Sequence, residues 1–201
     1  MKLRAAILAG GAARRFGGKA KGHCIVGGTR ILDNVAELVE TVTGSNPILV
    51  LGSSAQTHLG KGYETVVDTI PGKGTLGGIF TAVTDGDGPV LVVAWDMPFL
   101  SRNLLERLCA GCNDHDVYLP ASSNRRGVEP LCAVYGPECA APIEDQLHSN
   151  DLRAVGFHGR VNLGIIPLEE VREFGDPDRL FFNVNSDDDL KQAEKMWLRR
   201  E

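Results

Sequence analysis

Short apolar runs alternate with amphipathic segments through the first half of this 201-residue chain. The runs at 3–8, 47–51 and 90–94 have strand length and are almost continuously apolar, as strands covered on both faces of a sheet are. Residues 29–42, between the first two runs, carry apolar side chains at helical spacing. We therefore expect an α/β fold with a doubly wound, mainly parallel sheet. The length is typical of one domain, expected over residues 1–201.

Helix ends and the second half of the chain give further expectations. Thr29 and Ser101 are expected to cap the first helix and a helix through 109, because a hydroxyl oxygen can accept the unpaired N–H groups of a first turn. A glycine-rich segment, 71–78, is expected to lead into a short helix ending near 84. The other expected elements are strands over 65–67, 131–135 and 163–166 and helices over 138–148 and 186–199.

Charge and cysteine content narrow the class of protein. The net charge is −5, yet residues 1–32 carry seven Lys and Arg residues and no acid. An acidic chain lacks the broad basic face that nucleic acid or a membrane surface requires, so neither partner is expected, whereas a small basic pocket for a phosphorylated ligand remains open. No apolar run approaches the ~18–20 residues that cross a bilayer, and no signal-peptide pattern is present, so a cytoplasmic protein is expected. The five cysteines, an odd number, are expected as reduced thiols.

A glycine-rich and basic loop follows the first strand directly. Its glycines let the backbone turn N–H groups inward around a polyphosphate, and Arg15 and Lys21 add mobile positive charge at the same place. The open alternative is a flexible turn with exposed bases. A Walker phosphate loop is excluded, because Ala20 stands where the magnesium-binding hydroxyl of that motif would be.

A second glycine pattern raises a rival function. The segment Gly72-Lys73-Gly74-Thr75-Leu76-Gly77 has the letters of a dinucleotide-binding fingerprint, and Asp96 follows after about 20 residues, where a ribose-binding acid is expected. A non-catalytic NAD-binding module is therefore one alternative. Against it, Pro71 and a short loop separate these glycines from the preceding strand.

A carboxylate follows the most apolar strand of the chain, 90–94, at Asp96. Mg²⁺ usually takes one or two protein carboxylates, with phosphates and water completing its shell, so Asp96 could be its only protein ligand. The alternative is that Asp96 caps a turn before the helix that begins at Ser101. Asp68, which follows the strand at 65–67, is a second acid expected at the same rim of the sheet.

Taken in order, these motifs resemble the molybdenum cofactor guanylyltransferases, the MobA-type branch of the nucleotidyltransferases. The resemblance runs from residue 3 to about 195, and its five elements together are specific for the superfamily although each is weak alone. The resembling segments are Leu8-Ala9-Gly10-Gly11 with Arg14 to Gly18 and Lys21-Gly22, Gly74 to Ile79, Asp96-Met97-Pro98, Glu129-Pro130-Leu131, and Phe182 to Ser186. The resemblance implies a Rossmann-like three-layer nucleotidyltransferase fold with a mainly parallel sheet.

The resemblance also implies a reaction. GMP would be transferred from GTP to the terminal phosphate of a molybdopterin that bears molybdenum, with release of pyrophosphate. The attacking group is already an anion, so catalysis would consist of positioning and charge stabilisation by Arg15, Lys21 and Asp96, with Asp96 holding Mg²⁺. Molybdoenzymes or cofactor-insertion proteins are the implied protein contacts. A cytidylyl- or sugar-nucleotide transferase of the same fold is the alternative within the superfamily.

The resemblance assigns binding residues on both substrate sides. Asn183 and Asn185 would bind the acceptor, since amides offer both donors and acceptors to a pterin edge, and an Asx turn before Ser186 is their alternative role. The implied nucleotide-binding residues are Leu8, Ala9, Gly10, Gly11, Lys21, Asp68, Leu76, Gly77, Gly78 and Asp96.

Four positions depart from the family pattern, and they leave open which nucleotide base and which acceptor the chain binds. Ala20 stands in place of an Asp before the matched lysine, and Glu129 in place of a His before Pro130. The other two departures are Trp95 in place of a small residue and Gly52 in place of an Asn.

Overall fold

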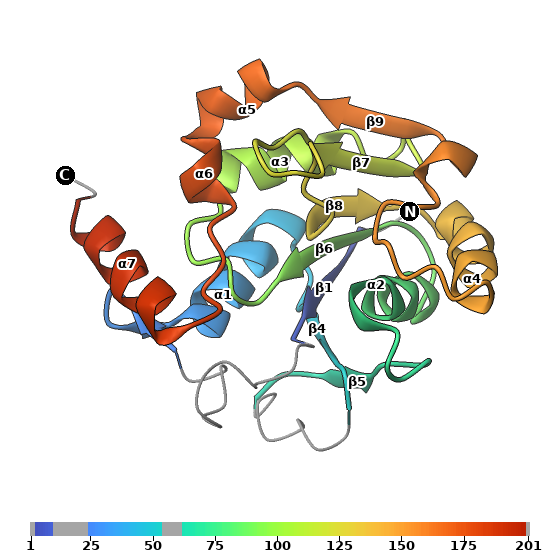
Figure 1. Ribbon diagram of the computed structural model, residues 1–201, viewed down its shortest axis with the longest axis horizontal. Coiled ribbons are helices and arrows are strands. Elements are labelled where there is room, and N and C mark those ends of the chain that lie inside the picture. The colour runs from blue at the N-terminus through green and yellow to red at the C-terminus, as the bar shows by residue number, and fades with distance from the viewer. Residues whose placement is uncertain (1–2, 10–23, 54–61, 200–201) are drawn as a thin grey trace.

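The computed structural model describes residues 3–9, 24–53 and 62–199. These residues form a seven-stranded sheet with the order β5-β4-β1-β6-β8-β7-β9 (Figure 1). All of its strands run in one direction except β8, which is antiparallel to both of its neighbours. The strands are β1 (Arg4–Leu8), β4 (Ile48–Leu51), β5 (Thr65–Val67), β6 (Val90–Ala94), β7 (Val117–Pro120), β8 (Cys132–Tyr135) and β9 (Leu163–Ile166).

Helices cover both faces of this sheet and complete three layers (Figure 1). On one face lie α1 (Ile31–Thr43) and α3 (Arg102–Ala110), and on the other lie α2 (Gly74–Thr84) and α4 (Ala140–His148). Further short helical elements are η4 (Pro137–Cys139), η5 (His158–Arg160), α5 (Leu168–Phe174) and α6 (Pro177–Leu180), and the last helix is α7 (Asp187–Leu198). None of the helices in the described ranges is long and apolar enough to span a membrane.

The central strand β6 shows why the apolar runs are continuous. Its five residues are all buried, and their side chains alternate between the two faces. Leu91 and Val93 belong to the core under α1 and α3, whereas Val90 and Val92 belong to the core under α2 and α4. A strand that faces helices on both sides therefore has no polar position, as the sequence predicted.

Most of the expected elements are confirmed within one to three residues, and Ser186 caps α7 through a hydrogen bond that its Oγ accepts from the Asp189 N–H (3.2 Å). The expected cap at Thr29 is wrong. Thr29 belongs instead to a small hairpin of β2 (Ile25–Val26) and β3 (Thr29–Arg30), and Arg30 occupies the N-cap of α1 without a side-chain bond. Ser101 is the N-cap of α3 but makes no capping bond either.

Several elements were not expected from the sequence. The strand β7 was missed because 117–120 ends in Pro120, which local propensity disfavours in a strand. Its position is set by pairing with β8 and β9 on either side. The helix expected over 138–148 begins as the single turn η4 and is α-helical from Ala140, and the short helices α5 and α6 were not expected at all.

Candidate active site

A cavity of about 610 Å³ opens over the carboxyl ends of β1, β4 and β6. Open α/β sheets bind their ligands at this rim, where helix N-termini and loops meet. Leu8, Gly52 and Asp96 reach the cavity from the three strand ends. Because β8 runs the other way, the loop before it lies at the same rim and adds Arg126 and Glu129 to the wall.

Asp96 lies at the centre of this rim, where its backbone is tied to the C-terminal part of the chain. The Asp96 carbonyl accepts a hydrogen bond from the Val184 N–H at 2.9 Å, and the neighbouring Trp95 N–H donates to the Leu8 carbonyl at 3.3 Å. The first bond holds Asn183 and Asn185, which flank Val184 and line the same cavity. The end of β6 thus brings together the residues expected on the nucleotide side and on the acceptor side.

Asp68 enters the cavity from the end of β5 and is only 6% exposed. Its Oδ1 accepts hydrogen bonds from the Thr81 hydroxyl (3.0 Å) and, at 3.4 Å, from the Ile70 N–H. Burial raises the pKa of Asp68, and these two bonds oppose the rise. A Cβ added at Gly77 would lie 3.0 Å from Asp68 Oδ2, so a glycine at this position gives the carboxylate its room.

Glu129 is buried in the wall of the same cavity, at 5% exposure. Its two carboxylate oxygens accept from the Leu131 N–H (3.1 Å) and from Asn124 Nδ2 (3.3 Å). Burial is the largest cause of the raised pKa of Glu129, and the nearby Asp96 carboxylate raises this pKa further. The hydrogen bond from the Leu131 N–H and the charge of Arg126 lower it.

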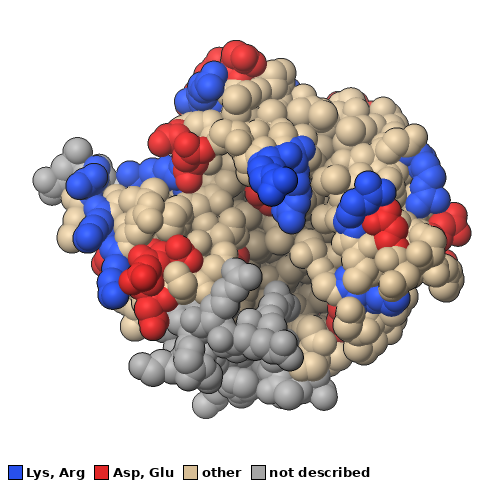
Figure 2. All heavy atoms as spheres, in the orientation of Figure 1, with Lys and Arg blue, Asp and Glu red and all other residues tan. Residues whose placement is uncertain are grey.

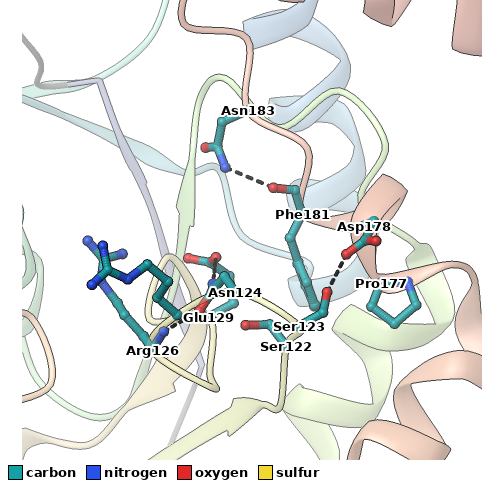
Figure 3. Close-up of a pocket in the computed structure, with 10 residues that line it drawn as sticks. Ser122, Ser123, Asn124, Arg126, Glu129, Pro177, Asp178, Phe181 and Asn183 are labelled. Atoms are coloured by element: carbon teal, nitrogen blue, oxygen red, sulfur yellow. Dashed lines mark hydrogen bonds between the residues drawn. The ribbon is translucent and has the colours of Figure 1, made fainter.

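A second cavity, of about 570 Å³, adjoins the first across Arg126, Glu129 and Asn183, which line both. Figure 3 shows its two sides, with the loop 122–129 on one and Pro177, Asp178, Phe181 and Asn183 on the other. The loop is held by backbone bonds from the Ser122 N–H to the Gly127 carbonyl (2.9 Å) and from the Glu129 N–H to the Pro120 carbonyl (3.0 Å). The Ser123 hydroxyl also bonds to the Asp178 carboxylate across the cavity.

The structure brings together six of the residues expected in the site. Leu8, Asp68, Gly78, Asp96, Asn183 and Asn185 line the first cavity. Ala9 and Leu76 do not line the cavity: each is fully buried in one of the two cores, and the Ala9 N–H donates to the Val50 carbonyl (2.9 Å). Gly77 lies behind Asp68. Gly10, Gly11, Arg15 and Lys21 lie outside the described residues.

Sequence reasoning missed Arg126 as a site residue. The only local signal was the basic pair at 125–126 just before the Glu129-Pro130-Leu131 segment. Three of the departures from the family pattern, Gly52, Trp95 and Glu129, also lie in the cavity wall. Asn183 Nδ2 donates to the Phe181 carbonyl at 2.8 Å, so its side chain is already ordered by the local backbone.

The charges around the site set what it can bind. Three carboxylates, those of Asp68, Asp96 and Glu129, line the first cavity, and Arg126 is the cation among its described lining residues. Basic side chains gather at the upper edge of the hollow in this face, and most of the acidic side chains in view lie toward the periphery (Figure 2). No group of three His, Cys, Asp or Glu residues in the described part could hold a metal ion by itself. This donor set fits Mg²⁺, which needs one or two carboxylates and takes its other oxygens from phosphates and water.

The sheet order does not support the dinucleotide fingerprint. In that motif the glycines follow one strand and the ribose-binding acid follows its neighbour. Here the glycines of 72–77 follow the edge strand β5, and Asp96 follows β6, with β4 and β1 between them. The glycines instead open α2 and line the cavity beside Asp68.

The sequence profile of the MobA-like NTP transferase domain matches residues 5–160, which include the ends of β1, β5 and β6 and the loop before β8. The chain belongs to this family. The resemblance noted from its motifs is therefore confirmed, as is the Rossmann-like α/β fold.

Relatives within the MobA-like family cover nearly the whole chain. A molybdenum cofactor guanylyltransferase of Desulfosudis oleivorans is 31% identical over 94% of this chain and 92% of its own length. A probable molybdenum cofactor guanylyltransferase of Pelotomaculum thermopropionicum is 32% identical over 94% of this chain and 91% of its own length. The crystal structure of the molybdopterin-guanine dinucleotide biosynthesis protein A of Archaeoglobus fulgidus superimposes with a TM-score of 0.80 at 29% identity, covering 96% of this chain and 97% of that one.

Proposed function

We propose that this chain is a molybdenum cofactor guanylyltransferase, which transfers GMP from GTP to the terminal phosphate of molybdenum-bearing molybdopterin and releases pyrophosphate. The observation that carries the proposal is that Asp68, Asp96 and Asn183 line one and the same cavity at the rim of the sheet. Membership of the MobA-like family and the names of the relatives support it. We also propose that residues 1–201 act as one nucleotidyltransferase domain, because β6 and the segment 183–185 contribute to the same site.

The nucleotide would lie on the side of the cavity formed by α2. Leu8, Asp68 and Gly78 line that side, and the N-terminus of α2 at Gly74 opens toward the same space. N–H groups at a helix N-terminus favour phosphate oxygens. We further propose, as the family resemblance implies, that the backbone at Gly10 and Gly11 and the charges of Arg15 and Lys21 bind the polyphosphate. The Ala9 N–H is not part of this proposal, because it donates to the Val50 carbonyl.

Asp96 would hold Mg²⁺ together with phosphate oxygens of GTP. When bound, the ion would neutralise charge on the phosphates and favour departure of pyrophosphate. The chain's own contribution is to place the acceptor phosphate against the α-phosphorus, so that one P–O bond forms as the bond to pyrophosphate breaks. Asn183 and Asn185, held over the end of β6 by the Val184 N–H bond to Asp96, would position the acceptor.

The test is Mg²⁺-dependent binding of GTP, CTP and UTP by calorimetry, followed by transfer of GMP to molybdenum-loaded molybdopterin. We expect selective binding of GTP, and a loss of transfer of about 10²–10³-fold in Asp96→Asn, the size typical of losing one charge-stabilising group. Asp114→Asn is the matched control, because Asp114 is exposed and lies before the amino end of β7, at the rim of the sheet opposite the cavity. Preference for CTP, or full activity of Asp96→Asn, would contradict the proposal.

A further inference from the structure

The second cavity contains polar groups that the transfer chemistry does not use. Ser122 is 7% exposed, lines this cavity and has a hydroxyl oxygen with no hydrogen-bond partner within the described residues. A buried hydroxyl that makes no bond costs free energy, so natural proteins keep few of them outside functional sites. Five buried side-chain atoms of the described residues lack a partner, and the Ser122 hydroxyl is the one of the five that belongs to the wall of this cavity, where a polar ligand would complete it.

The Glu129 carboxylate, in the same cavity as Ser122, can accept more hydrogen bonds than it receives. A carboxylate can accept about four hydrogen bonds, and two donors, the Leu131 N–H and Asn124 Nδ2, reach Glu129. No ion pair joins Glu129 to a Lys or Arg of the described segments. A buried carboxylate without such a pair is stabilised by any further donor that enters the cavity.

The opposite side of the cavity is suited to a flat ring. Phe181 lines it, and Figure 3 shows its ring facing the loop that carries Ser122 and Glu129. An aromatic wall that faces a carboxylate and a hydroxyl fits a planar heteroaromatic ring with N–H groups on one edge. A ring N–H adjacent to an exocyclic amino group matches the two oxygens of a carboxylate in the same way that a guanidinium does.

We propose that Glu129 binds a 2-amino-4-oxo heteroaromatic ring through its adjacent N–H and amino donors, in the cavity lined by Ser122 and Phe181, and that this ring is the pterin of the acceptor. The inference rests on the proposed function and deepens it. Guanine presents the same donor edge. Its expected place, however, is beside Asp68 and Gly78, which line only the first cavity. The shared wall at Arg126, Glu129 and Asn183 then places the acceptor ring next to the reacting phosphates.

The test compares two probes that differ at one group. Pterin carries the 2-amino group, and lumazine carries an oxo group in its place. In fluorescence titrations, the wild-type chain is expected to bind pterin at least about 10-fold more tightly than lumazine, since a site built for a donor rejects an analogue that lacks it. Glu129→Gln, which keeps the size of the side chain and one acceptor oxygen, is expected to lose this preference. Glu144→Gln, at an exposed position of α4, is the matched control and should keep it.

Separate titrations with GTP and ITP show which ring Glu129 recognises. We expect Glu129→Gln to bind Mg²⁺–GTP within about twofold of wild type and to keep its discrimination against ITP, which lacks the 2-amino group of guanine. Loss of that discrimination would overturn the proposal, because Glu129 would then bind guanine. An unchanged preference for pterin over lumazine in the variant, or no pterin binding by wild type, would overturn it as well.

A second variant keeps the test independent of how Glu129→Gln folds. Ser122→Ala removes only the unpartnered hydroxyl and is expected to weaken pterin binding severalfold without changing GTP binding. Equal pterin affinity in Ser122→Ala would place the ring elsewhere. Failure of the proposed function is a different result, because it would appear as absent GTP binding or absent GMP transfer in the wild-type chain.

Discussion

At the scale of single residues, two carboxylates of the cavity wall, those of Asp68 and Glu129, lie where burial and hydrogen bonding act on ionisation in opposite directions. Asp68 and Glu129 are almost fully buried, and burial raises the pKa of each. Each also accepts at least one N–H bond, which favours the charged form. A carboxylate that is kept in place despite the cost of burying it is typical of a site kept for ligand binding rather than for stability.

This arrangement predicts a pH-dependent gain of stability in Asp68→Asn. The folded-state pKa of Asp68 is raised, so the native carboxyl binds its proton more tightly than the unfolded one does. The pKa of the carboxyl is ~3.9 in the unfolded chain and higher in the folded protein. As the pH rises through this range the wild type loses stability, whereas the Asp68→Asn variant, which has no carboxyl at this position, does not. We expect the variant to melt a few degrees above wild type at pH 7 and the difference to shrink toward pH 4. Calorimetric melting at both pH values measures this, and a gain independent of pH would contradict it.

At the scale of elements, a single arginine from β1 joins the end of α2 to the loop that leads into β6. Arg4 Nη1 and Nη2 donate to the Ala82 and Val83 carbonyls of α2 (3.0 and 3.1 Å). Its Nη2 and Nε also donate to the Gly88 and Asp87 carbonyls, each at 3.1 Å. The carbonyls of a last helical turn have no partner within the helix, so this side chain satisfies them.

Replacing Arg4 should therefore destabilise the packing of α2 on the sheet. We expect Arg4→Met to lower the free energy of unfolding by about 2 kcal/mol, the size of one or two hydrogen bonds to a charged group. Arg4→Lys should recover little, because one ammonium cannot reach four carbonyls as a guanidinium does. Urea unfolding gives both values. Arg102→Met, which removes an exposed i,i+4 ion pair, is the control and should change stability by at most about 0.5 kcal/mol.

The hairpin β2–β3 depends on α7 in a comparable way. Gly27 adopts φ +62°, its N–H donates to Glu194 Oε1 (3.1 Å), and Trp197 packs directly over its Cα. An added Cβ would lie 2.0 Å from Trp197 Cε2, whereas at Gly28, also at positive φ, it would meet nothing within 4 Å.

These two glycines predict unequal effects of the same substitution. Gly27→Ala should displace Trp197 and loosen α7, with a loss of several kcal/mol, while Gly28→Ala should cost only the left-handed strain of about 1 kcal/mol. The measurement is unfolding stability together with hydrogen exchange of the α7 amides. Similar losses in the two variants would show that the contact with Trp197 contributes little.

At the scale of the whole molecule, the site is assembled from distant parts of the chain. Ends of β1, β4 and β6, the start of α2, the loop before β8 and the segment 183–185 all meet at one rim. A ligand that touches several of these parts binds the folded state and not the unfolded chain. Its binding free energy is therefore added to the stability of the whole fold.

Mg²⁺–GTP should accordingly raise the melting temperature of the chain. At a GTP concentration about 100 times the Kd, linkage gives about 2.7 kcal/mol, or roughly 5–10 °C for a chain of this size. NAD should give no shift, because two strands, β4 and β1, lie between the strand before the glycines of the dinucleotide pattern and the strand before its acid. Asp96→Asn should lose the part of the shift that requires Mg²⁺. A shift with NAD equal to that with GTP would contradict this assignment.

Local sequence determined the strands and helices that make the cores. A strand buried on both faces is apolar throughout and a helix buried on one face is apolar at helical spacing, so each segment shows its own pattern. It also identified Asp68, Asp96 and Asn183 at element ends, where the motifs lie. It did not reveal the strand β7, nor that β8, expected as a strand, runs antiparallel to its neighbours, since pairing depends on which strands are neighbours in space.

Only the tertiary structure decided how those residues form one site. The bond between the Val184 N–H and the Asp96 carbonyl joins segments far apart in the chain, and no local pattern encodes such a contact. The reversal of β8 places Glu129 at the rim, where burial and an unfilled acceptor set make it a candidate ligand for the substrate. Sequence fixes what each segment can bury, whereas the meeting of side chains from different segments depends on the packing of the whole sheet.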